Sequence, residues 1–582
     1  MLRAKSPPAK AQMNVSAPVV EPAPRKGFLS EFQICGLFLI TTLVIHFASA
    51  PFYFLYEDDY YHVGIPASQN LGWGWGQSHI VWHTWPQGRP ALFTALLLEG
   101  SFINATGSVL AGYLPALLII SANGYLAYRL FLLRLPPTAS LVGTLIGLLS
   151  CADPHKIMLT HMPLQFAITL NLLGLILYLN GRPVWAYFIA GSSLLFYEIS
   201  FAIFASAELF NLLHGRIRWK RLLASWGAWI GVAVAVFAFR LFRGEGRATE
   251  AAGNLAELGR RIMTNVVWGP VYGLENSFFH PLTEILHHPQ FWQLMLSLLG
   301  VLCLGLVAIK ATRIRGGEMK ADLALNLFVG LGILLLLIFG PYALQLKHTV
   351  FPGFRRPVTG FHLCFGVALG FGVALLLAKC VPQPRWTKVL YAVLLMLGCA
   401  SAYQNLLIQS DYVRSARYQA HFWQEVRRTA SDAQPGDVIL IPQQKLQESS
   451  YVLSNSWGVM HAWEVLFEQT EPLKDWSNFA SARPVAVFLV APDWESHITS
   501  EEGDYILHNP DYTPPGFPMG RIPLLPERVI VLEADYAGPF TRRTESIHAG
   551  NTRIELKKIP ATGPRILPYT KVAKYLFDNF ID

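Results

Sequence analysis

Acidic side chains stand directly after a long apolar run in the stretch "YEDDYYHVG", residues 56–64, which carries Glu57, Asp58 and Asp59. Adjacent carboxylates disfavour each other's ionisation, and a charge at the edge of a bilayer is costly. Such groups point to chemistry, because a carboxylate can accept the proton of an attacking hydroxyl group. Asp153 in "SCADPHK" and Glu198 in "LLFYEISF" are further acidic candidates at the ends of apolar runs.

Basic side chains gather in two other loops. The stretch "LQLKHTVFPGFRRPVTGFH" carries Lys347, His348, Arg355 and Arg356, and "QGRPALF" carries Arg89. A guanidinium group matches the oxygens of a phosphate, and cations near a leaving phosphate stabilise its charge. Carboxylates and cations together predict sugar transfer from a lipid-linked phosphate. The histidines, His62 included, are scattered along the chain, so no metal site is predicted.

Many helices are needed to bring these loops together. The chain of 582 residues is 52% hydrophobic and only 14% charged, well below the charge of an ordinary soluble domain. A bilayer needs about 20 apolar residues per helix. About eleven runs meet or approach this length, at 32–54, 107–133, 138–152, 162–180, 184–197, 199–213, 222–242, 291–309, 321–340, 358–378 and 388–408. The net charge of +8 falls mostly in short clusters between these runs, which argues against nucleic-acid binding.

The positions of Lys and Arg predict the orientation of the helices. Clusters such as "GRIRWKR" (215–221) and "KATRIRGGEMK" (310–320) fall on one side when the runs are counted in order, and that side should be the cytoplasm. We therefore expect a multi-pass protein of the plasma (inner) membrane, with a cytoplasmic N-terminus and the acidic and basic loops outside. The loop 243–290 is also placed outside, and "ELGRRIMTNVVWGPVYGL" within it predicts an amphipathic helix lying flat on the membrane.

Three regions follow from composition. Residues 1–27, rich in Pro, Ala and Lys, predict a disordered cytoplasmic tail, and residues 28–410 the transmembrane domain. Residues 411–582 predict an extracytoplasmic α/β or α+β domain, with strands expected at 438–442, 484–491 and 528–535. None of the six cysteines lies after Cys399, so this domain must fold without disulfide bonds.

The layout resembles the GT-C superfamily of membrane glycosyltransferases, which includes O-antigen glucosyltransferases, protein mannosyltransferases and aminoarabinose transferases. The resemblance rests on one helix followed by "EDDYYHVG", on "QGRPALF" before the second run, and on the hairpin "LLFYEIS", where Tyr197 stands in place of the family's basic residue. It implies an inverting transferase that uses a polyprenyl-phosphate sugar. It also implies Asp58 or Asp59 as base or acceptor-orienting group, with Asp153 assisting.

The resemblance further implies donor-phosphate contacts by Arg355, Arg356 and Lys347. Arg89 is a further candidate for the donor phosphate, and supporting roles are predicted for Glu57, His62, Glu198 and His348. Some members use a divalent cation and others do not, so the cofactor stays open. The acceptor is a glycan, lipid or protein of the cell envelope. Two other interpretations remain: a transporter or flippase of a lipid-linked anionic substrate, and a non-catalytic envelope assembly protein.

Overall fold

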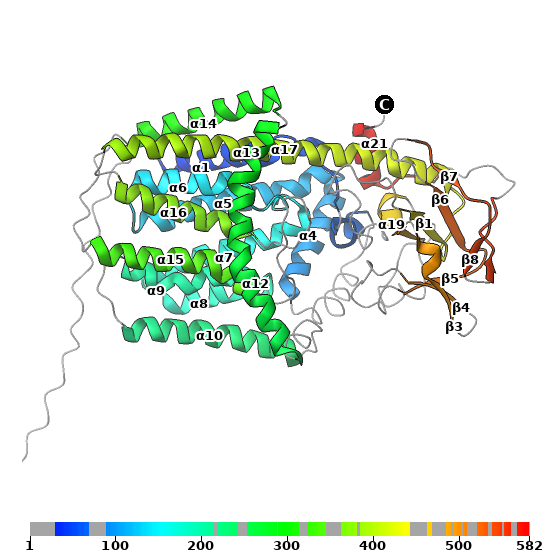
Figure 1. The fold of residues 1–582 in the computed structure, drawn as a ribbon, viewed down its shortest axis with the longest axis horizontal. Helices are drawn as coiled ribbons and strands as arrows, with labels where there is room; N and C mark the ends of the chain where they lie inside the picture. The colour runs from blue at the N-terminus through cyan, green and yellow to red at the C-terminus, as the bar shows by residue number, and fades with distance from the viewer. Residues whose placement is uncertain are drawn as a thin grey trace, which may run out of the picture.

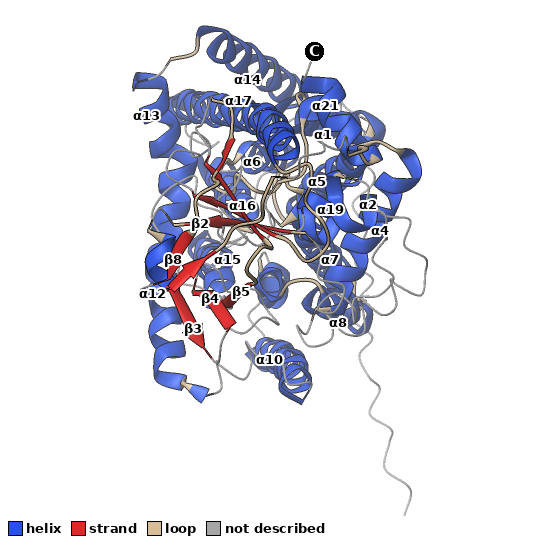
Figure 2. Cartoon of the chain, turned by 90° about the vertical axis from the view of Figure 1, so that its right-hand side faces the viewer, coloured by secondary structure: helices blue, strands red, loops and turns tan. Residues whose placement is uncertain are grey.

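A computed structural model gives the fold of the chain (Figures 1 and 2). Up to residue 442 it describes residues 30–56, 58–68, 89–213, 219–242, 253–287, 289–312, 323–344, 362–380 and 384–442. Beyond that it describes 462–467, 485–491, 493–501, 504–508, 521–533, 538–549, 552–559 and 567–580. Glu57, Lys347, His348, Arg355 and Arg356 lie outside the described residues, so the roles predicted for them stay predictions.

Five described helical segments are long and apolar enough to cross a membrane. They are Glu31–Phe52 (α1, Glu31–Thr42, with η1, Leu43–Phe47, and η2, Ala50–Phe52), α5 (Val109–Leu132), Leu159–Leu179 (η5, Leu159–His161, with α7, Met162–Leu179), α10 (Trp219–Phe242) and Lys388–Thr429 of α17 (Pro384–Thr429). The protein is thus a helical membrane protein, as the composition predicts.

The other six predicted runs also fall on helical segments, although these do not by themselves establish further spans. They are α6 (Pro137–Leu149), α8 (Pro183–Ser192) with η6 (Ser193–Leu195), η7 (Glu198–Ser206) with α9 (Ala207–Leu212), α14 (Phe291–Thr312), α15 (Leu323–Ala343) and α16 (Phe365–Cys380). The total of about eleven spans therefore stays a prediction beyond the five.

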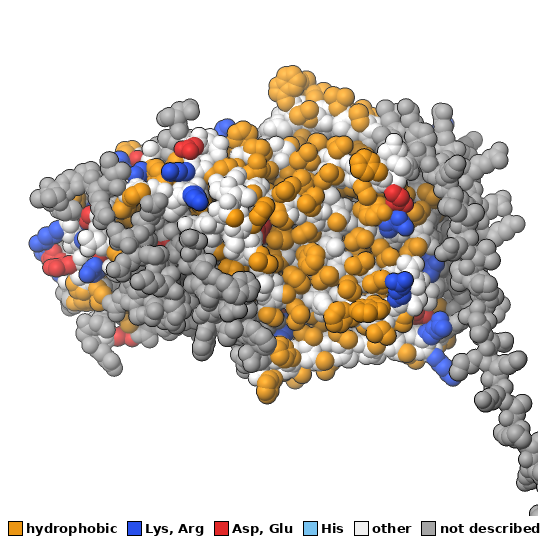
Figure 3. All heavy atoms as spheres, turned by 180° about the vertical axis from the view of Figure 1, so that it is seen from behind, with side chains coloured by type: hydrophobic (Ala, Val, Ile, Leu, Met, Phe, Trp, Pro, Cys, Tyr) orange, Lys and Arg blue, Asp and Glu red, His pale blue; other side chains and the backbone are white. Residues whose placement is uncertain are grey.

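The surface of the bundle matches a lipid environment. Large apolar side chains such as Phe188, Val234 and Leu296 are more than half exposed. Figure 3 shows a broad band of hydrophobic side chains over the helices, with Lys and Arg side chains gathered at the end of the bundle away from the sheets. An exposed apolar band of this size is expected where lipid, not water, covers the protein.

Helices α6 and α16 pack closely through paired glycines. Gly143 and Gly147 of α6 face Gly370 and Gly366 of α16, and each pair has the small-xxx-small spacing that lets membrane helices approach. A Cβ built on Gly370 would lie 2.8 Å from the Gly143 carbonyl oxygen, and one on Gly366 2.7 Å from that of Gly147. These helices can therefore not carry larger side chains there without moving apart.

Gly370→Ala should for this reason lower the free energy of unfolding by about 1–3 kcal/mol, the usual cost of overpacking. Thermal unfolding of the purified protein in detergent would measure the effect. Gly227→Ala in α10 is the matched control, because a Cβ at Gly227 meets nothing within 4 Å. Equal melting temperatures for the two variants would contradict the close packing of α6 and α16.

Helix α12 (Leu255–Leu274) runs crosswise to α10, α15 and α16 in Figure 1. The Asn254 side chain caps it by accepting from the Glu257 N–H, at 3.1 Å. Glu257 in turn pairs with Arg260 and Arg261 one turn later. The predicted helix over 257–274 is therefore confirmed, whereas its place at the membrane surface stays a prediction.

Several further short elements join or cover the bundle. Helix α4 (Pro90–Thr106) was not anticipated from the sequence; it begins with Pro90 and ends at Gly107, whose φ of 69° is the left-handed geometry of a helix C-terminus. The remaining elements are η3 (Tyr60–Gly64), α2 (Ile65–Ser68), η8 (Glu275–Phe279), α13 (His280–His287), α19 (Ala462–Leu466), η10 (Trp494–His497) and α21 (Lys571–Phe580).

The C-terminal part contains small sheets beside the end of α17 (Figure 1). The largest has the order β2-β1-β6-β7, with β1 (Val438–Pro442) parallel to β2 (Ala486–Val490) and β6 (Val529–Glu533), and β7 (Thr541–Arg542) antiparallel to β6. The strands predicted at 438–442, 484–491 and 528–535 are thus found. The others are β3 (Ile498–Glu501), β4 (Asp504–His508), β5 (Arg521–Leu524), β8 (Ile547–Ala549) and β9 (Thr552–Ile554).

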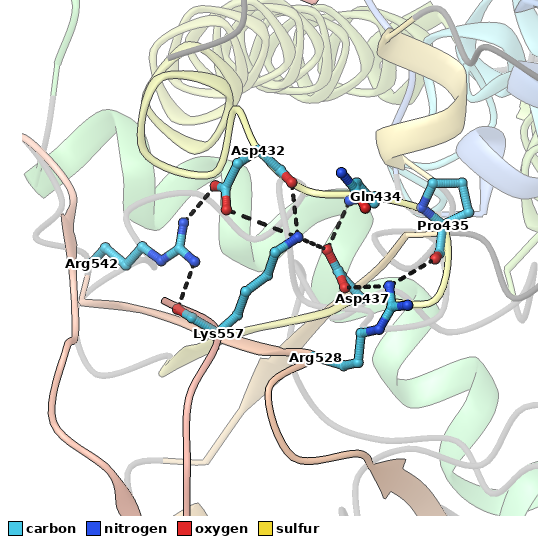
Figure 4. A network of polar contacts seen from close by, with 7 residues as sticks. All are labelled: Asp432, Gln434, Pro435, Asp437, Arg528, Arg542 and Lys557. Atoms are coloured by element: carbon cyan, nitrogen blue, oxygen red, sulfur yellow. Dashed lines mark hydrogen bonds and ion pairs between the residues drawn. The ribbon is translucent and has the colours of Figure 1, made fainter. Parts of the chain in front are cut away.

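One continuous helix joins the two parts, because α17 runs through residue 410, where the sequence places the domain boundary. A network of ion pairs holds its end against the largest sheet (Figure 4). Lys557 bonds the carboxylate of buried Asp437 and the carbonyl oxygen of Asp432, and Arg542 bonds the Asp432 carboxylate at 2.5 Å. The largest sheet is therefore attached to the end of α17 by charged side chains.

Candidate active site

The first loop turns inward after α1 and packs against the distal half of α17. Tyr56 and Tyr60 are fully buried. The Tyr56 hydroxyl donates to the Tyr412 carbonyl oxygen at 2.8 Å, and the Trp423 ring N–H donates to the Tyr60 hydroxyl at 3.1 Å. The tyrosines of "YEDDYYHVG" thus fix this loop to the helix that carries the C-terminal part, at one end of the bundle.

Asp59 is buried completely and acts as an acceptor for two backbone segments. Its Oδ2 accepts from the Tyr56 N–H at 3.1 Å, and its Oδ1 accepts from the Thr160 N–H at 2.8 Å. Burial raises the pKa of Asp59 to about 7, against the lowering effect of these two amides. Asp59 therefore ties the first loop to the loop that precedes α7. Its neighbour Asp58 is only half-buried.

This raised pKa predicts a pH dependence of stability. Between the ordinary value of 3.8 and about 7, the folded state holds more protons at Asp59 than the unfolded chain does. The contribution of Asp59 to the free energy of unfolding should therefore fall as pH rises through this range, and level off above it. Thermal unfolding in detergent from pH 4 to 8 should show a flatter profile for Asp59→Asn than for Asp58→Asn. Parallel profiles would contradict the assignment.

The loop between α6 and α7 carries Asp153, His155 and Lys156. Asp153 Oδ1 accepts from the His155 N–H at 3.1 Å, whereas its buried Oδ2 has no hydrogen-bond partner among the described residues. The Lys156 ammonium donates to the Ser150 carbonyl oxygen at 2.6 Å. Burial lowers the pKa of Lys156 to about 8, with the charge of Asp153 opposing the change. Lys156 is therefore mostly protonated at pH 7.

A cavity of about 80 Å³ lies between α5, α6, α7 and α16, beneath this loop. Its wall is mostly apolar and contains Gly147, Gly366 and Gly370 of the glycine contact. The polar side chains that line it are Asn123, Thr144, Ser150, Asp153, Lys156, Gln165 and His362. One carboxylate and one ammonium group thus face a largely apolar space inside the helical bundle.

A second cluster joins three charged side chains around the hairpin before η7. Arg89 bonds both carboxylate oxygens of Glu198, at 2.5 and 3.1 Å, and Arg240 lies 3.5 Å from Glu198 Oε2. All three side chains are at most 11% exposed. Burial raises the pKa of Glu198, but the two guanidinium groups outweigh it and hold the pKa at about 2. The cluster carries a net charge of +1.

The predicted site residues thus fall into separate places. Asp153 lines the cavity, and Asp59 holds the loop that carries Asp153. Arg89 and Glu198 bind each other, and the Arg89 guanidinium also lies over the Tyr197 ring, 4.5 Å from its centroid. His62 packs against Phe93, with ring centroids 4.9 Å apart. Within the described residues no three His, Cys, Asp or Glu side chains are arranged to hold a metal ion.

Sequence reasoning missed His362, Tyr342 and Arg240. The Tyr342 hydroxyl lies 2.6 Å from His362 Nδ1, so it fixes a ring that lines the cavity. Arg240 could have been found, because an arginine at the end of the apolar run 222–242 is costly without a partner. Tyr342 and His362 gave no such signal, since neither spacing nor charge sets them apart.

Comparisons with known proteins add nothing to this description of the site. No family, no curated protein and no solved structure matches the chain.

Proposed function

We propose that the protein is a membrane glycosyltransferase that moves a sugar from a polyprenyl-phosphate donor to a glycan, lipid or protein acceptor on the outer face. The observation that carries the proposal is the cavity, in which Asp153 and Lys156 face a largely apolar space between helices. The apolar part of the wall suits a donor with a lipid tail, and the charged side chains in the wall suit its charged head.

Asp153 suits the acceptor hydroxyl, and Lys156 suits the leaving phosphate. The acceptor hydroxyl oxygen bonds the anomeric carbon while the bond from that carbon to the phosphate oxygen breaks. The hydroxyl proton passes to Oδ2 of Asp153, which has no hydrogen-bond partner among the described residues, and the phosphate leaves with the bonding electron pair. Lys156 then stabilises the phosphate charge. Arg355 and Arg356, predicted for the same task, would add to it.

Other predicted residues support the site from outside the cavity. Asp59 bonds the Thr160 N–H and so positions the loop that holds Asp153 and Lys156. Half-buried Asp58 remains the alternative base. The resemblance to the GT-C superfamily adds support through the hairpin, since Glu198 is paired with basic residues here as well. Its partners are Arg89 and Arg240 rather than the residue before it, Tyr197.

One observation favours a carrier instead. Glu99 of α4 is 3% exposed, and neither of its carboxylate oxygens has a hydrogen-bond partner among the described residues. Burial, together with the nearby charge of Asp59, raises the pKa of Glu99 well above its usual range. A buried carboxyl that gains and loses a proton is typical of proton-coupled transporters.

Mass spectrometry of envelope glycans from cells with and without the gene tests the proposal. A transferase predicts the loss of one sugar from a glycan that is otherwise complete, and wild-type protein in liposomes should transfer sugar from added donor to acceptor on the same side. A carrier predicts donor movement across the liposome membrane without any transfer. An unchanged glycan profile together with inactive liposomes would refute both functions and favour an assembly protein.

A further inference from the structure

His362 contributes a ring to the wall of the cavity that Asp153 and Lys156 also line. It lies just before α16, and the Tyr342 hydroxyl at the end of α15 holds its Nδ1 at 2.6 Å. Because one ring nitrogen is occupied by Tyr342, Nε2 is the nitrogen left for other contacts. The surrounding protein also lowers the pKa of His362 through burial, so the ring is neutral at pH 7.

Helix α12 packs against Tyr342 through two glycines. A Cβ on Gly269 would overlap the Tyr342 ring, and one on Gly273 would lie 3.0 Å from its hydroxyl oxygen and 2.6 Å from the Phe365 ring. Tyr342 is 2% exposed. The two glycines therefore allow the tyrosine to reach the histidine, which links the crosswise helix to the cavity.

From this arrangement, and resting on the proposed function, we propose that His362 contacts the sugar donor or acceptor through Nε2 as a neutral imidazole, and that Tyr342 is the positioning residue that orients it. The contact of Nδ1 with the Tyr342 hydroxyl fixes the orientation of the ring and leaves Nε2 for the substrate. Gly269 and Gly273 then serve the reaction indirectly, by leaving room for Tyr342.

Amide substitutions of His362 separate a substrate contact from a structural role. His362→Gln places an amide near the position of Nε2, and His362→Asn places one near Nδ1. If Nε2 contacts the substrate, the glutamine variant should keep clearly more transfer activity than the asparagine variant, and His362→Ala should lose on the order of 100-fold. If His362 only holds Tyr342 in place, the order of the two amide variants reverses, and that result would overturn the proposal.

Tyr342→Phe tests the positioning role, since it keeps the ring against α12 and removes only the hydroxyl. We expect kcat to fall roughly 10-fold, the value of one hydrogen bond, with little change in the KM of the donor. Gly269→Ala should have a similar effect by displacing the ring. Gly259→Ala is the matched control on the same helix, because a Cβ there meets nothing within 4 Å. Unchanged kcat in Tyr342→Phe would overturn the positioning role.

The assay uses full-length protein in liposomes with a polyprenyl-phosphate-linked sugar as donor. Failure of this inference is distinguishable from failure of the proposed function. If wild-type protein transfers sugar and Asp153→Asn does not, while every His362 variant is fully active, only the role of His362 is refuted. If wild-type protein transfers no sugar and its loss leaves the envelope glycans unchanged, the transferase itself is refuted.

Discussion

Replacing Asp153 by asparagine should lower sugar transfer by about 10²–10⁴-fold, the contribution of a positioned general base. Asparagine keeps an oxygen that can accept the His155 N–H, so the local turn should survive. It cannot take a proton from the acceptor hydroxyl at the position of Oδ2, the oxygen that has no partner among the described residues. Initial rates with purified protein in liposomes, at saturating donor, measure the change.

Three other aspartates show whether the effect belongs to Asp153. Asp578→Asn changes an exposed carboxylate on α21 and should leave the rate unchanged. Asp59→Asn should reduce activity together with thermal stability, because it loosens the loop at Thr160. Asp58→Asn separates the two candidate bases. If it abolishes transfer while Asp153→Asn does not, Asp58 is the base and Asp153 has another role.

Apolar runs predict helices well because a membrane allows few other structures for them. All eleven runs fall on helical segments, and the strands at 438–442, 484–491 and 528–535 are present. Helix α4 was not predicted, because residues 90–106 lie between a charged loop and a longer apolar run that itself predicts a helix. The continuity of α17 across residue 410 escaped as well, since the change from apolar to amphipathic composition occurs inside one helix.

The site was less predictable because burial and pairing depend on distant segments. Asp58 and Asp59 are adjacent in the sequence, yet only Asp59 is fully buried, through contacts with Tyr56 and Thr160. Sequence reasoning gave Arg89 and Glu198 separate roles, whereas the fold places them in contact. Arg240 joins them from 42 residues beyond Glu198 along the chain, which no local pattern reveals.

Glu198→Gln should lower the free energy of unfolding by about 3–5 kcal/mol, the cost of leaving a buried charge without its partner. Glu198 pairs with both Arg89 and Arg240, and the three side chains are at most 11% exposed. Removing its charge takes away the carboxylate that both guanidinium groups contact in a poorly solvated place. Unfolding in mixed micelles, followed by tryptophan fluorescence, measures the loss.

The matched control is Glu31→Gln, which breaks the ion pair between Glu31 and Arg129 at 2.9 Å. These side chains are 60% and 43% exposed, so water replaces the lost contact and the change should be within about 1 kcal/mol. Equal effects of Glu198→Gln and Glu31→Gln would mean that water reaches the Arg89 cluster, and the assignment of a buried cluster would then be wrong.

The order of the arginine variants tests how the cluster is built. Arg89 makes two hydrogen bonds to Glu198, whereas Arg240 approaches only one oxygen, at 3.5 Å. Arg240→Met keeps the ion pair in which Arg89 makes two hydrogen bonds to Glu198. It should therefore lower the free energy of unfolding less than Arg89→Met, which keeps only the 3.5 Å contact between Arg240 and Glu198. If Arg240→Met proves nearly neutral for stability but lowers donor affinity, the positive charge of Arg240 serves an anion such as the donor phosphate. If Arg240→Met changes neither stability nor donor affinity, the cluster only links the loop before α4, the hairpin and α10.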